Sequence, residues 1–365
     1  MNINWIIGRC NKVLFGIEED DAQTECLEEK ELSVNLSLAS RHGVLPLVIQ
    51  SLSDAEFPTR EAKKTFIKWY STSERSKEKY LKRVKLMESL SLCFKKAGLD
   101  VMFLKGAVTA QLYPDPQLRV FGDIDYYMFG ESDKSIEVLN TVGIKTSEYF
   151  NHHTQASASG ILLENHYDFL DRQNHQGNLL IDDELKRLAS IEGHQYPFKF
   201  DNPEADNAYC MSPTMNALFL MRHMAAHFFS ETVPLRMLYD WSLFLNRYHE
   251  DVDWNRVNEL YKQSGMADFP RMIQGILVSK LKLSTLVCPI EPLYGETTEK
   301  VWQSIIESPA SNPYKKNSIR FLLFEARTFA KNRWKHQIVF KNESYTKLFI
   351  NYVWLYLKEK VTGKK

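Results

Sequence analysis

The sequence has none of the gross features that mark several classes of protein. Its 46 Lys and Arg residues are balanced by 46 Asp and Glu residues, so no net charge favours a polyanion or a membrane surface. A nucleic-acid binder that relies on bulk charge is therefore disfavoured, although a local basic patch is not excluded. We find no internal repeat and no low-complexity tract in the 365 residues.

Cysteine is also scarce, and its spacing does not suggest metal or disulfide chemistry. The five cysteines form no CxxC pair: Cys10, Cys26, Cys93, Cys210 and Cys288. An odd, scattered set argues against a disulfide framework or a zinc ribbon and is typical of a reducing cytosol. No apolar run reaches the roughly 18 residues of a membrane span, and residues 1–15 do not read as a signal peptide. We therefore expect a cytoplasmic protein that does not contact a membrane.

The spacing of apolar residues predicts helices in the first part of the chain. Residues 65–97 carry apolar side chains at helical intervals, and Gly98 follows as a C-cap. The period then changes, because short apolar runs rich in β-branched and aromatic residues predict strands. The predicted strands are 99–104, 124–129 and 160–169, with predicted helices at 107–113 and 132–142.

A helical period returns at Ser212 and persists toward the end of the chain. Ser212 and Pro213 have the residue types of an N-cap and a first helical position. Residues 199–209 are the predicted linker before this part. The expected fold is α+β, a small mixed sheet with helices. Its predicted regions are an N-terminal helical region at 1–98, the α/β domain at 99–205 and a C-terminal helical domain at 206–365.

Two carboxylates stand two residues apart at the start of the predicted strand 124–129. Side chains alternate along a strand, so Asp123 and Asp125 project from one face while Ile124 points into the core. Two like charges on one face are costly unless a cation compensates them. The pair therefore predicts a divalent metal site. Mg²⁺ is the first candidate, because it prefers oxygen ligands alongside substrate phosphates, and Mn²⁺ is the alternative.

Residues upstream of this pair have the character of a phosphate site. Gly106 lies between the predicted strand and helix and permits a close backbone approach. The helix start that follows directs free N–H groups at an anion. Lys105 and Arg119 add cations nearby. Lys105, Gly106 and Arg119 are therefore the predicted nucleotide ligands.

These residues resemble a known pattern. The segments Leu-Lys-Gly at 104–106, Tyr-Pro-Asp-Pro at 113–116 and Arg119 followed by Gly-Asp-Ile-Asp at 122–125 are similar to the DNA-polymerase-β-like nucleotidyltransferase superfamily. Within it they most resemble the bacterial nucleotidyltransferase family 5. The family's later elements are matched by residues 164–167, His223, His227, Asp240-Trp241 and Asp253-Trp254. The resemblance spans residues 40–260, and its specific part is 105–125.

The resemblance implies a function. It indicates a magnesium-dependent transfer of a nucleotidyl group from a nucleoside triphosphate to a hydroxyl acceptor, which is a small molecule, a protein or RNA. Asp123 and Asp125 would bind the metal, Gly106 and the next helix start would hold the β- and γ-phosphates, and Glu164 would complete the catalytic set. The alternative is a noncatalytic nucleotide-binding module, or a toxin–antitoxin-like module whose helical part binds a partner. Three acids at one sheet edge favour the enzyme, and two alone favour the binding module.

The third carboxylate is the least determined by the sequence. Glu164 follows the apolar run 161–163 and is favoured because His166 and Tyr167 add to the resemblance. Asp182 follows a similar run at 179–181, and Asp168 is a further candidate. The third acid would bind the metal jointly or deprotonate the acceptor hydroxyl.

Other polar clusters carry weaker hypotheses. His223 and His227 have the i, i+4 spacing of a zinc pair, and Arg222 with His227 has the spacing of HEPN-type ribonucleases. Packing or substrate contact is the favoured role for both patterns. The basic stretch 327–341 is interpreted as a solvated face, with an RNA acceptor as the alternative.

Overall fold

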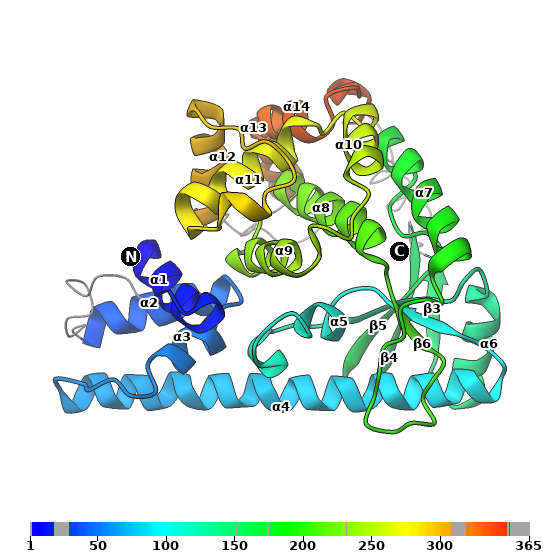
Figure 1. Cartoon of the computed structure of the whole chain (residues 1–365), viewed down its shortest axis with the longest axis horizontal. Helices are drawn as coiled ribbons and strands as arrows, with labels where there is room; N and C mark the ends of the chain where they lie inside the picture. The colour runs from blue at the N-terminus through cyan, green and yellow to red at the C-terminus, as the bar shows by residue number, and fades with distance from the viewer. Residues whose placement is uncertain are drawn as a thin grey trace.

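A six-stranded mixed sheet lies over one half of a long helix, α4 (Arg60–Lys96), and a group of helices covers its opposite face (Figure 1). The computed structural model describes residues 2–17, 29–149, 152–173, 175–230, 232–307, 319–348 and 350. The predicted α+β class is confirmed. The strands are β1 (Val101–Phe103), β2 (Ile124–Tyr127), β3 (Thr146–Tyr149), β4 (His153–Ala158), β5 (Ile161–His166) and β6 (Ala208–Cys210).

The other helices lie beside the sheet, on its side away from α4, and over the free half of α4 (Figure 1). They are α1 (Ile3–Phe15), α2 (Glu29–Arg41), α3 (Leu45–Ser51), α5 (Ala107–Ala110), α6 (Ser132–Thr141), α7 (Gln176–Glu192), α8 (Pro213–Ser230), α9 (Leu235–Tyr248), α10 (Trp254–Gln263), α11 (Asp268–Leu281), α12 (Glu296–Ile306), α13 (Ile319–Lys331) and α14 (Arg333–Val339). Short 3-10 turns lie at Pro116–Leu118 and Thr285–Val287. Among the described residues, no helix has the length and apolar composition needed to cross a bilayer.

The central strands set the geometry of the polar residues. The strands are ordered β3-β4-β5-β2-β1-β6, and β2 pairs in parallel with β5 and antiparallel with β1. The β2–β5 register places Asp125 directly opposite Glu164. Paired residues in adjacent strands carry their side chains on the same face of the sheet. The two acids are therefore neighbours although they are 39 positions apart in the sequence.

Both faces of the sheet are covered, as the alternation along β2 requires. Ile124 and Tyr126 belong to the core beneath the sheet, where the Tyr126 ring lies 5.8 Å from Phe94 of α4. Tyr127 faces the other way, and its ring lies 4.3 Å from that of Phe169. The predicted core position of Ile124 is confirmed, because this side chain is only 2% exposed.

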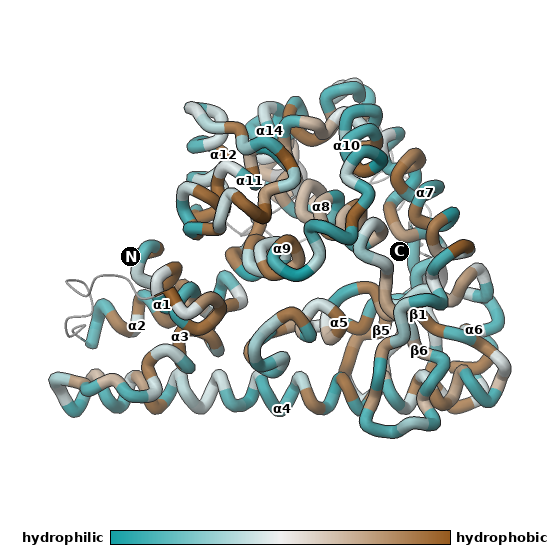
Figure 2. The backbone as a smooth tube through the Cα atoms, viewed as in Figure 1, coloured by the Kyte–Doolittle hydropathy of each residue, from teal (hydrophilic) through white to brown (hydrophobic). Residues whose placement is uncertain are grey.

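The long helix α4 joins the two ends of the molecule. Thr59 caps it by accepting a hydrogen bond from the backbone N–H of Ala62 at 3.1 Å, so the helix starts before the predicted residue 65. Its fully buried residues are concentrated in the half beneath the sheet, and Figure 2 shows that hydrophilic residues occur along much of its length. In contrast, α8 is buried on most sides, because it packs against α7, α9, α10 and α14.

Several elements lie where the sequence did not predict them. Strands β3 and β4 were missed because their residues are mostly polar or small, and helix α7 was also missed. The predicted linker 199–209 is wrong at its end, because Ala208 pairs with Val101 and Tyr209 with Met102 in β6. The sheet therefore continues past residue 205. A three-residue strand carries almost no periodic signal, and only its partner β1 defines it.

Candidate active site

The Asp-x-Asp pair lies at one end of β2, on the face opposite α4. Asp125 is the second residue of the strand and is 4% exposed, whereas Asp123 directly precedes the strand and is half-buried. The intervening Ile124 anchors the backbone in the core below. The period of two thus directs both carboxylates to the same side.

Glu164 of β5 joins this pair. Carboxylate oxygens of Asp123, Asp125 and Glu164 all lie within 4.8 Å of one another. Two come from the β2 segment and the third from the adjacent parallel strand, so the sheet register itself brings them together. Three carboxylates with converging oxygen atoms are a donor set suited to a hard divalent cation such as Mg²⁺.

Two basic side chains contact Asp125. The Lys105 ammonium lies 3.0 Å from Asp125 Oδ1, and His166 Nε2 lies 3.1 Å from the same oxygen. Burial by itself raises the pKa of Asp125, but the attraction of Lys105 and the hydrogen bond with His166 outweigh it and lower that pKa. Burial lowers the pKa of Lys105, but Asp125 and then Asp123 outweigh it and raise that pKa. Lys105 therefore supplies positive charge beside the carboxylates of Asp125 and Asp123.

Glu164 has the opposite electrostatic character. Burial raises its pKa, the negative charge of Asp125 raises it further, and Lys105 offsets this only in part. Its Oε1 accepts a hydrogen bond from the Gln155 amide at 3.1 Å. Among the three acids, Asp125 is held ionised while Glu164 takes up a proton more readily. Such a difference between neighbouring carboxyls is typical of a pair that divides charge stabilisation from proton transfer.

A group of histidines borders the acids, and the sequence pattern pointed only to His166 among them. The rings of His152 and His153 lie 5.2 and 5.4 Å from that of His166, and His153, Glu164 and His166 form a second set of possible metal ligands. Burial holds the pKa of His152 at about 3 and that of His153 at about 4. The His-His doublet was visible in the sequence, but only the pairing of β4 with β5 places it beside His166.

Gly106 is explained by packing inside the protein. Its φ of 61° lies in the region that favours glycine, and a Cβ atom there would lie 2.9 Å from the Phe121 ring. The close approach predicted for this residue is therefore made by Phe121. Helix α5, which begins after Gly106, has only four residues, so the dipole expected to attract a phosphate is small.

Arg119 has a different environment from the one predicted. Its guanidinium forms a bidentate ion pair with Asp240 of α9, at 2.8 and 2.7 Å, and donates a third hydrogen bond to the Gly106 carbonyl at 3.0 Å. Tyr113 donates a hydrogen bond to the same Asp240 at 2.8 Å. Arg119 is 3% exposed. In this structure the Arg119 guanidinium joins the Gly106 turn to α9, and its predicted contact with a phosphate stays a prediction.

The competing acids lie elsewhere. Asp182 of α7 accepts hydrogen bonds from the Leu170 N–H at 3.0 Å and from Arg172 at 2.6 Å. Asp168 pairs with Lys186. Neither acid belongs to a metal-ligand set among the described residues, whereas Glu164 belongs to both sets.

The weaker hypotheses also have a structural outcome. Arg222 is buried, donates hydrogen bonds to Asn178 and to the Val339 carbonyl, and stacks over Phe340, so it serves the packing of α8 against α7 and α14. His223 and His227 are in ring contact at 4.6 Å but belong to no set of three ligands in the described part of the chain. The basic stretch 327–341 is not wholly a solvated face, because Lys335 is 7% exposed and lies over the Phe228 ring.

Comparison with known proteins agrees with the resemblance seen in the motifs. Residues 28–276, more than half of the chain, match the model of a family described as uncharacterised nucleotidyltransferase. No curated protein and no solved structure matches the chain. The matched region includes the three acids, Lys105, the Gly106 turn and the Arg119–Asp240 ion pair. The chain therefore belongs to this uncharacterised nucleotidyltransferase family.

Proposed function

We propose that the protein transfers a nucleotidyl group from a nucleoside triphosphate to a hydroxyl acceptor, with Mg²⁺ or Mn²⁺ as the metal. The observation that carries this proposal is the convergence of Asp123, Asp125 and Glu164 within 4.8 Å in a member of a nucleotidyltransferase family. The third acid favours an enzyme over a noncatalytic nucleotide-binding module, because metal and nucleotide binding alone do not require a base.

The donor set fits a hard divalent cation. Asp123 and Asp125 would hold it together with Glu164, and the ion pair of Lys105 with Asp125 supports the view that these carboxylates attract positive charge. When bound, the metal supplies charge neutralisation at the α-phosphate and orients the reacting oxygens. Asp125 is suited to this duty because its surroundings lower its pKa and keep it ionised.

The reaction forms one P–O bond and breaks another. The acceptor oxygen attacks the α-phosphorus, the bond from that phosphorus to the bridging oxygen of the β-phosphate breaks, and pyrophosphate leaves. Glu164 accepts the proton of the acceptor hydroxyl, a role that its raised pKa supports. Lys105 stabilises negative charge that develops on the phosphate oxygens. Arg119 and Asp240 act indirectly, by holding the Gly106 turn in place.

The test is a transfer assay with a matched variant. The protein is incubated with each α-labelled nucleoside triphosphate, Mg²⁺ or Mn²⁺ and a cell extract, and the labelled product is then located. Wild-type protein and Glu137→Gln, which removes an exposed acid on α6, should label the same product. Asp123→Asn should lose at least roughly a hundredfold in rate. Absence of a labelled product with all four nucleotides, or equal labelling by Asp123→Asn, would overturn the proposal.

A further inference from the structure

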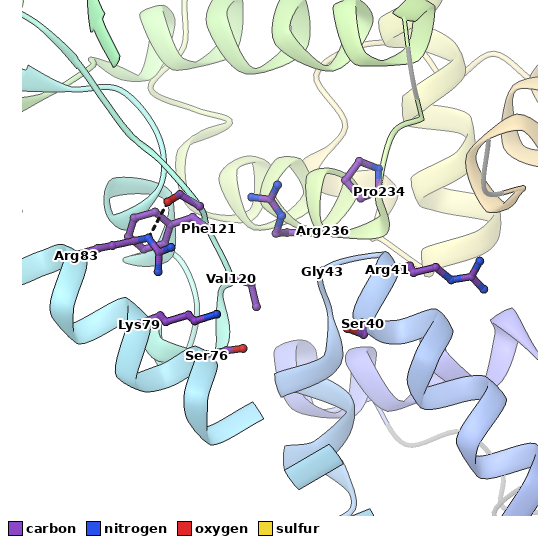
Figure 3. A pocket seen from close by; sticks show the side chains of 11 residues that line it. Ser40, Arg41, Gly43, Ser76, Lys79, Arg83, Val120, Phe121, Pro234 and Arg236 are labelled. Atoms are coloured by element: carbon purple, nitrogen blue, oxygen red, sulfur yellow. Dashed lines mark hydrogen bonds between the residues drawn. The ribbon is translucent and has the colours of Figure 1, made fainter. Parts of the chain in front are cut away.

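A cavity of about 370 Å³ lies between α4, the end of α2, the start of α9 and the loop before β2 (Figure 3). Its wall includes Lys79 and Arg83 of α4, Arg236 of α9 and Gly122, which directly precedes Asp123. The volume is at the lower end of the range for small-molecule sites. Arg41 and two serines complete its polar lining, and no Asp or Glu lines it.

Three of these cations, Lys79, Arg83 and Arg236, form no ion pair with a carboxylate in the described part of the chain. In contrast, the buried Arg119 is paired with Asp240. Lys79 is exposed, and Arg236 is half-buried. Cations gathered without partners in a concave site repel one another, and an anion that binds between them relieves that cost.

Two of these cations, Arg83 and Arg236, are held in position by contacts within the protein. Arg83 donates a hydrogen bond to the Gly122 carbonyl at 2.9 Å and lies over the Phe121 ring, and Figure 3 shows this contact beside Lys79. The Arg236 side chain packs on Gly43, where an added Cβ atom would lie 3.2 Å from Arg236 Cδ. Asp123 acts electrostatically on both arginines. Asp123 therefore lies close enough to the cavity to attract two of the cations that line it.

We propose that this cavity binds a phosphate group of a substrate whose reacting atoms lie at Asp123, Asp125 and Glu164. Three cations match a group carrying two or more negative charges better than a single carboxylate, and Lys and Arg are the side chains that bind phosphate through charge-assisted hydrogen bonds. The phosphate belongs either to the tail of the nucleoside triphosphate or to the acceptor. The link to a substrate rests on the proposed function, whereas phosphate binding itself does not.

The first experiment measures binding of inorganic tripolyphosphate by calorimetry in buffer containing EDTA, so that the acids contribute no metal-mediated affinity. Wild-type protein should bind, with affinity that falls as ionic strength rises. Lys79→Gln should weaken binding about tenfold, the loss of one charge-assisted contact. The control Lys82→Gln removes an exposed lysine of the same helix that does not line the cavity, and it should bind as wild type does.

Two further variants keep the result interpretable. Arg236→Gln should weaken binding at least as much as Lys79→Gln, with an unchanged circular dichroism spectrum. Asp123→Asn should bind tripolyphosphate as tightly as wild type or more tightly, because it removes a nearby negative charge. A protein that binds tripolyphosphate but transfers no nucleotide would leave this proposal standing while the proposed function fails. No binding by wild type, or equal losses for Lys79→Gln and Lys82→Gln, would overturn it.

The source of the phosphate is decided with a nucleoside triphosphate that has an α,β-methylene bridge, titrated in the presence of Mg²⁺. If Lys79→Gln weakens its binding but not that of the corresponding nucleoside, the cavity holds the triphosphate tail. If Lys79→Gln binds this analogue normally and loses only tripolyphosphate binding, the cavity holds a phosphate of the acceptor. Both outcomes support a phosphate site.

Discussion

Replacing Asp240 with asparagine removes the negative charge that neutralises Arg119 inside the protein. The two side chains are 6% and 3% exposed, and they meet through two hydrogen bonds of 2.8 and 2.7 Å. Tyr113 donates a third hydrogen bond to Asp240 at 2.8 Å. The ion pair joins the segment before β2 to helix α9, so its loss affects the contact between the sheet and the C-terminal helices.

The magnitude follows from the burial of the cation that is left behind. Breaking a buried ion pair by removing one partner costs about 3–5 kcal/mol, because the other charge remains desolvated and unpaired. An asparagine retains one acceptor oxygen, so we expect a loss at the lower end, about 3 kcal/mol. In contrast, the exposed pair Lys134–Glu131, with side chains 62% and 46% exposed, should contribute no more than about 0.5 kcal/mol.

The assay is urea unfolding of wild type, Asp240→Asn and the control Glu131→Gln. The double variant Arg119→Met with Asp240→Leu removes both charges and should recover part of the stability lost in Asp240→Asn. A loss below about 1 kcal/mol in Asp240→Asn, or a double variant less stable than the single one, would refute this account of the ion pair.

Three further predictions concern single residues. Asp123→Asn should leave the metal-free protein at least as stable as wild type in thermal unfolding, because it relieves the repulsion between Asp123 and Asp125. Asp125→Asn should lower the stability, because it leaves the Lys105 ammonium without its carboxylate partner. Equal effects of the two changes would contradict this prediction. Gly106→Ala should lower the free energy of unfolding by roughly 1–3 kcal/mol, because of its φ of 61° and the nearby aromatic ring, whereas Gly122→Ala, with open space around its Cβ position, should be nearly neutral. His42 is 3% exposed, and burial lowers its pKa from 6.5 to about 4. The folded protein therefore favours the neutral imidazole. The stability that this provides is complete above pH 6.5 and is lost as the pH falls toward 4. Between pH 7 and pH 5 the free energy of unfolding of wild type should therefore fall by about 2 kcal/mol more than that of His42→Gln. Parallel pH profiles of the two proteins in urea unfolding would disprove this prediction.

Local patterns in the sequence were sufficient for the directions of side chains and for the class of the fold. The alternation of Asp123, Ile124 and Asp125 is a property of a single strand, so it predicted that both acids share one face with the core below them. The need for glycine at position 106 was also predicted from local pattern, because this residue separates a predicted strand from a predicted helix. Periodicities of two and 3.6 residues depend only on near neighbours in the chain, and these survive in any tertiary context.

Which side chains meet across the chain was decided by tertiary structure alone. Glu164 and Asp182 follow similar apolar runs, and only the β2–β5 register places Glu164 beside Asp125. Arg119 was expected at a phosphate but pairs with Asp240, 121 residues away. Charge and hydrogen-bonding capacity can be read from a residue type. The partner that satisfies them depends on the path of the chain, because an ion pair forms wherever folding brings the two groups within hydrogen-bond distance.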